Sequence, residues 1–192
     1  MNVYDFDNTL YDGESSFDFF LYCLRRRPVL LRHLPKVLRF LARYKRAKVT
    51  HEMLLAEMDA YAEEVYAILP DVQALTLSFW KTHEKKLRKA FYQEHRRPDD
   101  VVVSASFDFF LKPACDMLGV KTVLGSSFDF ESGKVVRLCF ADEKPRVFGQ
   151  AFPEAVIDAF YTDSLVDTPL SAKAKKAYLV KKDGRVVPFP EK

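Results

Sequence analysis

Three short apolar runs in this chain each end in polar side chains that can take part in chemistry. Asp5 follows the run 2–4, Ser104 follows the run 101–103, and Asp163 follows the run 159–162. Short runs rich in β-branched and aromatic residues are typical of strands buried in a parallel sheet. After residue 98 such runs alternate with helical stretches, which predicts an α/β fold with a doubly wound parallel sheet.

The first polar segment carries two carboxylates one residue apart, Asp5 and Asp7. Because side chains alternate along a strand, the two would share a side where the strand opens into a loop. Carboxylates held together repel unless a cation neutralises them, and Mg²⁺ prefers such oxygen ligands. The spacing indicates a nucleophile and acid/base pair, and a solvated turn is the alternative for the pair taken alone.

The later polar segments supply other parts of an anion site. Ser104 precedes a stretch that reads as the start of a helix, where backbone N–H groups favour an anion. Lys144 can supply the fixed positive charge that a phosphate requires, although a lysine taken alone is usually a surface residue. Asp163 and Asp167 form an acidic cluster at a strand end, with a capped turn as the alternative.

Together these residues resemble the motifs of the haloacid dehalogenase-like hydrolase superfamily, in particular its phosphoserine phosphatase-like branch. The four motifs stand in family order, and their residues are Asp5, Asp7 and Thr9, then Ser104, then Lys144, then Asp163, Ser164 and Asp167. The resemblance implies a Rossmann-like core and a Mg²⁺-dependent phosphomonoester hydrolase that acts on a small phosphorylated metabolite.

The resemblance also implies a role for each motif residue. Asp5 would attack phosphorus to form an aspartyl-phosphate, and Asp7 would act as general acid and then general base. The groups implied to hold Mg²⁺ are the Asp5 carboxylate, the Asp7 main-chain carbonyl and Asp163. Asp167 is implied to act on the metal indirectly, through the residues that bind it. The groups implied to bind the phosphoryl oxygens are Ser104, Lys144 and the backbone N–H groups near Phe6 and Ala105.

Substrate identity is less specified. The acid Asp7 favours phosphatase turnover, because the family's dehalogenases lack an acid there and its ion-pumping ATPases carry threonine. Glu14 matches an acid that contacts the substrate amino group in phosphoserine phosphatases, but Ala105 and Ser106 replace the two glycines of those enzymes. The alternatives are a lipid-phosphate phosphatase, a phosphotransferase, or a catalytically weak binding or sensor protein with a basic cap.

Residues 15–97 lack strand signals and show helical periodicity, with leucines at 30, 34, 38 and 41 expected on one face and a helix expected over 71–91. The resemblance implies that this stretch is a helical cap domain inserted after the first strand. Residues 1–14 and 98–192 would form the catalytic core. Turn residues predict two hairpins, within 128–139 and 178–189.

The charge of the expected cap is uneven. Residues 25–48 contain ten Lys or Arg and no acid, whereas five acids lie within 52–64. One interpretation is that the two groups pair within a solvated bundle. The other is that the basic face steers anionic substrates or rests on anionic lipid. Nucleic-acid binding is a poorer fit, since the net charge is only +3.

The remaining features carry weaker signals. The tetrapeptide Ser-Phe-Asp-Phe begins at residues 16, 106 and 127, at irregular spacing that we interpret as coincidence. Three separated cysteines without metal-ligand spacing favour a reducing, cytoplasmic setting. A membrane-spanning helix or signal peptide is not expected, because apolar runs are short and Asp5 and Asp7 interrupt the N-terminal one. Nothing in the sequence indicates an oligomeric state.

Overall fold

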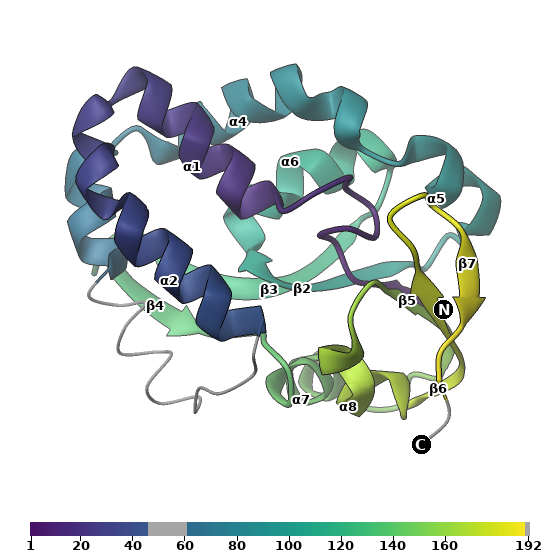
Figure 1. The fold of residues 1–192 in the computed structure, drawn as a ribbon. Helices are drawn as coiled ribbons and strands as arrows, with labels where there is room; N and C mark the ends of the chain where they lie inside the picture. Colours follow the sequence, from purple (N-terminus) through teal and green to yellow (C-terminus); the bar gives the residue numbers. More distant parts are fainter. Residues whose placement is uncertain (46–60, 191–192) are drawn as a thin grey trace.

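The computed structural model describes residues 1–45 and 61–190. Within them, seven strands form one sheet in the order β4-β3-β2-β1-β5-β6-β7 (Figure 1). The strands are β1 (Asn2–Tyr4), β2 (Val101–Phe107), β3 (Thr122–Asp129), β4 (Lys134–Arg137), β5 (Ile157–Thr162), β6 (Ala174–Val180) and β7 (Val186–Pro188). The five inner strands are parallel, and β4 and β7 are antiparallel edge strands. The predicted doubly wound sheet and both predicted hairpins are confirmed.

The order of the strands positions the candidate site. The chain runs from the central strand β1 to β2 and β3 on one side, and then crosses to β5 and β6 on the other. In open α/β sheets, ligands bind at the carboxyl ends of strands where the strand order reverses. Here that point brings together the ends of β1, β2 and β5.

Helices cover both faces of the sheet, with α4 and α6 on one face and α7 and α8 on the other (Figure 1). The helices and 3₁₀ turns that lie wholly within the described residues are α1 (Ser15–Arg26), η1 (Pro28–His33), α2 (Leu34–Lys45), α4 (Val72–His83), η2 (Glu84–Lys86), α5 (Lys89–His95), α6 (Asp108–Leu118), α7 (Glu143–Ala151), η3 (Leu165–Asp167) and α8 (Thr168–Ser171). Among the described residues, no helix is long and apolar enough to cross a membrane.

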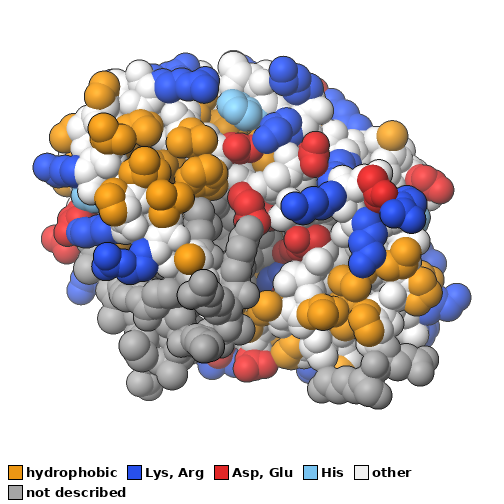
Figure 2. Space-filling model, viewed as in Figure 1, with side chains coloured by type: hydrophobic (Ala, Val, Ile, Leu, Met, Phe, Trp, Pro, Cys, Tyr) orange, Lys and Arg blue, Asp and Glu red, His pale blue; other side chains and the backbone are white. Residues whose placement is uncertain are grey.

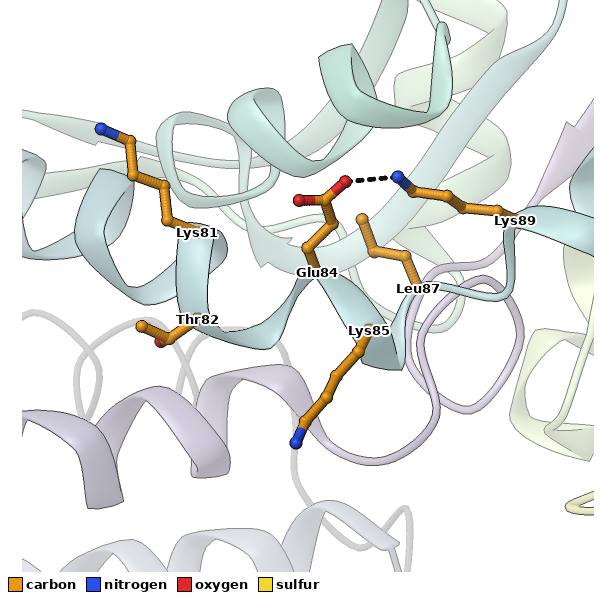
Figure 3. Close-up of a pocket in the computed structure, with 6 residues that line it drawn as sticks. All are labelled: Lys81, Thr82, Glu84, Lys85, Leu87 and Lys89. Carbon is orange, nitrogen blue, oxygen red and sulfur yellow. Dashed lines mark hydrogen bonds and ion pairs between the residues drawn. The ribbon is translucent and has the colours of Figure 1, made fainter.

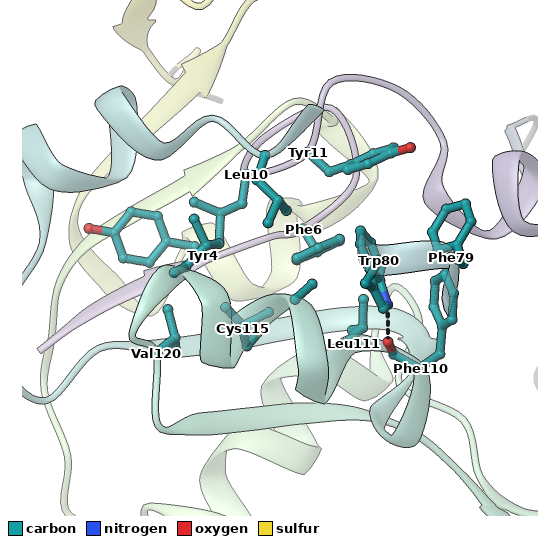
Figure 4. Close-up of a cluster of buried hydrophobic side chains, with 14 of the residues drawn as sticks. Tyr4, Phe6, Leu10, Tyr11, Phe79, Trp80, Phe110, Leu111, Cys115 and Val120 are labelled. Carbon is teal, nitrogen blue, oxygen red and sulfur yellow. Dashed lines mark hydrogen bonds between the residues drawn. The ribbon is translucent and has the colours of Figure 1, made fainter. Parts of the chain in front are cut away.

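Successive side chains of the central strands point to opposite faces of the sheet and belong to two different hydrophobic clusters. Val3 belongs to the cluster under α7 and α8, whereas Tyr4 belongs to the larger cluster on the opposite face. Figure 4 shows that larger cluster, in which the Trp80 indole N–H donates to the Phe110 carbonyl over 2.6 Å. Helices α1, α4 and α5, from the expected cap segment, contribute to this cluster together with β1 and α6. The division into core and cap stays a prediction.

Two helical expectations are wrong in detail. The helix expected over 71–91 is interrupted at η2, because residues 84–88 pair with the loop after β1 instead of continuing a helix. The Asp12 N–H donates to the Lys86 carbonyl and the Arg88 N–H to the Leu10 carbonyl, each over 2.8 Å.

The four leucines expected on one helix face do not share one buried face. Leu30 is buried and Leu38 is exposed, since a 3₁₀ turn precedes α2 and changes the periodicity; the side chain of Leu41 lies outside the described residues.

Candidate active site

The first carboxylate, Asp5, directly follows β1 and extends its pairing with β5. The Asp5 N–H donates to the Tyr161 carbonyl over 2.8 Å, which fixes the start of the loop. Its side chain is buried. Burial raises the pKa of the Asp5 carboxyl well above its usual range, Lys144 acts against this rise, and the charges of Asp167 and Asp163 add to it.

Lys144, in the first turn of α7, lies between two of the predicted acids. Its Nζ is 2.8 Å from Asp5 Oδ1 and 2.8 Å from both carboxylate oxygens of Asp167. The Thr162 hydroxyl also donates to Asp167, over 2.7 Å. The Lys144 side chain is only 3% exposed, so the alternative of a surface lysine is wrong. A buried ammonium is costly unless it is paired, and here the pairing joins α7 to the end of β1 and to η3, which follows β5.

Both carboxylate oxygens of Asp7 accept hydrogen bonds. Its Oδ1 accepts from the Ser15 N–H over 2.6 Å, and its Oδ2 accepts from the Ser106 hydroxyl over 3.0 Å. Burial raises the pKa of Asp7 to about 6, against the lowering effect of the hydrogen bonds from Ser15 and Ser106. A carboxyl with a raised pKa is suited to donate a proton near neutral pH.

Ser104 lies at a break in the pairing of β2 with β3. The register shifts between Val103 and Phe107, as at a β-bulge, and the Ser104 hydroxyl accepts from the Ser106 N–H over 3.2 Å. The Ala105 carbonyl accepts from the Ser126 hydroxyl over 2.7 Å. Bulges leave backbone groups unpaired and re-aim side chains, which suits a strand end that meets a ligand.

A glycine on β3 permits this bulge. A Cβ atom at Gly125 would lie 2.6 Å from the Ser106 carbonyl oxygen and 2.8 Å from the Asp108 nitrogen. Contacts this short between backbone atoms and a side chain are not tolerated, so only glycine allows β3 to approach here.

The loop after Asp5 is a tight turn anchored in the core. The Phe6 carbonyl accepts from the N–H groups of three following residues, Thr9, Leu10 and Tyr11. The Phe6 ring is fully buried, with its centroid 5.7 Å from that of Trp80. Glu14, at the far end of the loop, accepts from the Asn8 side-chain amide over 3.2 Å. The predicted contacts of Phe6, Ala105 and Glu14 with substrate stay predictions.

The predicted Mg²⁺ ligands are compatible with the metal in their donor chemistry. Asp163 stands at the exposed edge of the site, and partial desolvation, with repulsion from Glu14 and Asp167, raises its pKa to about 6. A bound cation would relieve this crowding of acids. Among the described residues, no three His, Cys, Asp or Glu side chains are grouped to hold a metal. The predicted set uses only the carboxylates of Asp5 and Asp163 directly, with the Asp7 carbonyl, and Mg²⁺ usually keeps several waters.

A surface depression of about 470 Å³ lies elsewhere, along α4, η2 and α5. It is lined by Lys81, Thr82, Glu84, Lys85, Leu87 and Lys89, none of which is a predicted site residue. Figure 3 shows the Glu84 carboxylate paired with Lys89, while Lys81 and Lys85 point in different directions. Since its ammonium groups do not converge, we assign no ligand to this depression.

A family model described as haloacid dehalogenase-like hydrolase matches residues 3–172. The chain belongs to this family and is an enzyme of the hydrolase class. This agrees with the sheet order and with the convergence of Asp5, Lys144 and Asp167. No curated protein matches the chain.

Three solved structures show the same fold. A protein of unknown function from Bordetella pertussis Tohama I is 19% identical, with a TM-score of 0.71, over 92% of this chain and 87% of that chain. A phosphoserine phosphohydrolase-like protein from Francisella tularensis is 16% identical, with a TM-score of 0.59, over 92% and 86%. Phosphoserine phosphatase from T. onnurineus is 22% identical, with a TM-score of 0.54, over 92% and 81%. The chain therefore shares its fold with proteins that include a phosphoserine phosphatase and a phosphoserine phosphohydrolase-like protein.

Sequence reasoning missed three polar groups that contact the predicted residues. Thr162 bonds Asp167, Ser15 bonds Asp7 through its backbone, and Ser106 bonds both Asp7 and Ser104. Thr162 and Ser106 were detectable as hydroxyls at strand ends beside a motif residue. The Ser15 contact depends on how α1 leaves the loop, for which the sequence carries no signal.

Proposed function

We propose that this chain is a Mg²⁺-dependent phosphomonoester hydrolase that works through an aspartyl-phosphate on Asp5. The observation that carries the proposal is the buried ammonium of Lys144, which contacts both Asp5 and Asp167. Asp7, two residues after Asp5, is held separately by hydrogen bonds at both of its carboxylate oxygens. A nucleophile, a fixed cation and a separately held acid are the protein groups that this reaction needs.

In the proposed first step, an Asp5 carboxylate oxygen forms a bond to phosphorus while the bond from phosphorus to the leaving oxygen breaks. Asp7 donates its proton to that leaving oxygen. In the second step, Asp7 removes a proton from water, the water oxygen bonds to phosphorus, and the phosphorus–Asp5 bond breaks. Lys144 would exchange its contact with Asp5 for the phosphoryl oxygens, which Ser104 and the Phe6 and Ala105 N–H groups also bind.

We infer that the carboxylates of Asp5 and Asp163 and the carbonyl of Asp7 hold Mg²⁺. Bound there, the metal supplies positive charge to the phosphoryl oxygens. Asp167 acts indirectly, since its oxygens are already bonded to Lys144 and Thr162.

For the substrate, we propose a small phosphorylated metabolite. The structural neighbours from Francisella tularensis and T. onnurineus are a phosphoserine phosphohydrolase-like protein and a phosphoserine phosphatase. Glu14 also has the sequence position of an acid that binds a substrate amino group in such enzymes. We do not assign phosphoserine itself, because Ala105 and Ser106 replace the glycines expected there. We place the reaction in the cytoplasm, in keeping with three buried free thiols.

A second candidate is a lipid phosphate presented at an anionic membrane. Hydrophobic side chains gather over α1 and α2, with Lys and Arg at their margin (Figure 2). Within the basic segment 25–48, the side chains of Val29 and Leu31 in η1 are 49% and 58% exposed, and that of Leu38 in α2 is 49% exposed. Exposed apolar side chains beside cations are suited to an anionic lipid surface. The competing interpretation also has support, since Lys36 pairs with Glu64 over 2.8 Å.

Vesicle co-sedimentation separates these two interpretations of the basic segment. If the segment binds lipid, Leu31→Asp with Leu38→Asp removes binding to anionic vesicles, whereas Val156→Asp, at an equally exposed valine, leaves it unchanged. No dependence of binding on anionic lipid would eliminate the second candidate.

The test of the proposed hydrolase is turnover of an aryl phosphate with Mg²⁺ and with EDTA. We expect hydrolysis that requires Mg²⁺ and is lost in Asp5→Asn, which removes the nucleophile but nearly preserves its shape. Equal turnover by Asp5→Asn would show that the nucleophile is assigned wrongly. Mg²⁺-dependent binding of a phosphate mimic without turnover would favour the binding or sensor protein instead.

A further inference from the structure

Two of the three Ser-Phe-Asp-Phe segments meet at the candidate active site. Ser16, from the first segment, lies in the first turn of α1, and Ser106, from the second, lies near the end of β2. Their hydroxyl oxygens are 2.9 Å apart, although 90 positions separate them in the chain. The repetition that we interpreted as coincidence therefore places two hydroxyls in contact beside Asp7.

From Ser106 the hydrogen bonds continue to the proposed general acid. The Ser106 hydroxyl is 3.0 Å from Asp7 Oδ2, and the Ser15 N–H is 2.6 Å from Asp7 Oδ1. Both carboxylate oxygens are thus linked to the first turn of α1, one directly and one through Ser106. The N-cap residue Glu14 forms no side-chain cap bond, so Asp7 serves as an acceptor for an N–H group that the helix leaves unpaired.

The chemistry of the two hydroxyls suits a group that must both give and take a proton. A hydroxyl has one proton to donate and two lone pairs. With Asp7 ionised, Ser106 donates to Asp7 and accepts from Ser16. With Asp7 protonated, the two hydroxyl bonds, Asp7–Ser106 and Ser106–Ser16, can both reverse without any heavy atom moving, whereas the Ser15 N–H stays a donor. An N–H donor at the same place could not reverse in this way.

We propose that Ser106 and Ser16 are a positioning pair for Asp7, which hold its carboxylate in one direction and couple that direction to α1. This inference rests on the proposed function, because it assigns Asp7 as general acid. Ser106 is 8% exposed, so its bond to Asp7 faces little competition from water. Hydrogen bonds to charged groups are worth about 1.5–3 kcal/mol, which corresponds to roughly 10–150-fold in a rate.

The test compares kcat for two substrates that differ in their need for an acid. An alkyl phosphate has a poor leaving group and requires the Asp7 proton, whereas a nitrophenyl phosphate requires it much less. We expect Ser106→Ala to lower kcat for the alkyl phosphate about tenfold, with a smaller loss for the aryl phosphate and little change in KM. Ser106→Thr should restore most of the loss.

Matched variants define the controls. Ser171, in α8, is also 8% exposed and donates to the Thr168 carbonyl, so Ser171→Ala removes a comparable hydroxyl away from Asp7 and should leave both rates unchanged. Because Ser16 acts through Ser106, adding Ser16→Ala to Ser106→Ala should cause no further loss. Equal losses on the two substrates, or wild-type rates for Ser106→Ala, would overturn the proposal.

A measurement without turnover separates this inference from the proposed function. In urea unfolding, the effects of Asp7→Asn and Ser106→Ala should be non-additive, because each removes the same hydrogen bond. Additive effects would overturn the positioning pair even in an active enzyme. Non-additive effects in a protein that shows no Asp5-dependent hydrolysis would support the contact between Ser106 and Asp7 but refute its role in catalysis.

Discussion

At the scale of single residues, the site depends on one buried lysine that bridges two acids. Lys144 contacts Asp5 and Asp167, so three charges taken from water satisfy one another. The order of the motifs in the sequence pointed to these three residues, but the sequence did not predict that Lys144 contacts both acids. Composition alone favours a solvated lysine, and only the packing of α7 against the sheet buries it.

Replacing this lysine by methionine should damage both stability and activity. Lys144→Met keeps most of the side chain's length but leaves two buried carboxylates facing each other. Breaking a buried ion pair in this way costs about 3–5 kcal/mol. We expect that loss in urea unfolding and the loss of most activity on the aryl phosphate.

The matched control is Lys112→Met, which removes an exposed lysine that pairs with Asp116 one helical turn away. Exposed pairs of this kind contribute about 0.3–0.5 kcal/mol, so stability and activity should stay near wild type. Equal effects of the two substitutions would mean that burial of Lys144 does not matter.

At the scale of elements, η2 supports the loop after β1. It interrupts the helix that periodicity predicts over 71–91, because its backbone pairs with the loop after β1. Its last residue, Lys86, binds Asp18 in α1, and the Tyr11 hydroxyl donates to the same carboxylate over 2.6 Å. Periodicity detected the helical content and missed the break, since the partners lie more than 65 residues away in the chain.

Removing the Asp18 charge should loosen this support. Asp18→Asn weakens the contacts with Lys86 and Tyr11, which are partly exposed, so we expect a stability loss of only about 1 kcal/mol. Amide hydrogen exchange over residues 8–14 should become faster, because local opening becomes easier. Unchanged protection in that loop, with Arg185→Gln as a surface control, would contradict a supporting role for η2.

A second element-scale prediction concerns Asp158 at the start of β5. Lys175 in β6 and Arg97 before β2 each lie 2.8 Å from its carboxylate. The hydrogen bond from Lys175 is the largest cause that lowers the pKa of Asp158 below its usual range. A lowered pKa contributes stability that is present above the ordinary value, about 3.9, and is lost as the pH falls through the folded-state value.

We therefore expect Asp158→Asn to be less stable than wild type at pH 7, with the difference shrinking as the pH falls below about 4. Urea unfolding at several pH values measures this directly. A difference that grows towards acid would mean that the sign of the pKa shift is wrong.

At the scale of the whole molecule, the helices of the expected cap segment and the sheet share one hydrophobic cluster. Trp80, the single tryptophan, packs in α4 against Phe6 from the loop after β1 and Phe110 in α6. The α/β class and the doubly wound parallel sheet followed from alternating apolar runs, whereas the order of the strands became known only from the structure. The shared cluster could not be predicted, because aromatic residues scattered over a helical stretch do not indicate which surface they cover.

The shared cluster predicts one cooperative unfolding transition. Trp80 fluorescence, which reports on α4, should change at the same urea concentration as the far-ultraviolet circular dichroism of the whole chain. Trp80→Ala should cost about 3–5 kcal/mol, whereas Trp80→Phe should cost less because it leaves a smaller cavity. A fluorescence transition well before the dichroism change would indicate that α4 unfolds separately from the sheet.

The most direct test of the central claim is a search for a phosphoryl group on Asp5. Enzyme mixed with an aryl phosphate and Mg²⁺ is quenched in acid at short times and analysed by peptide mass spectrometry. We predict an added phosphoryl group on the peptide that contains Asp5, formed before inorganic phosphate and absent in Asp5→Asn. Mg²⁺-dependent turnover that persists in Asp5→Asn, with no phosphorylated peptide at any time, would contradict the account.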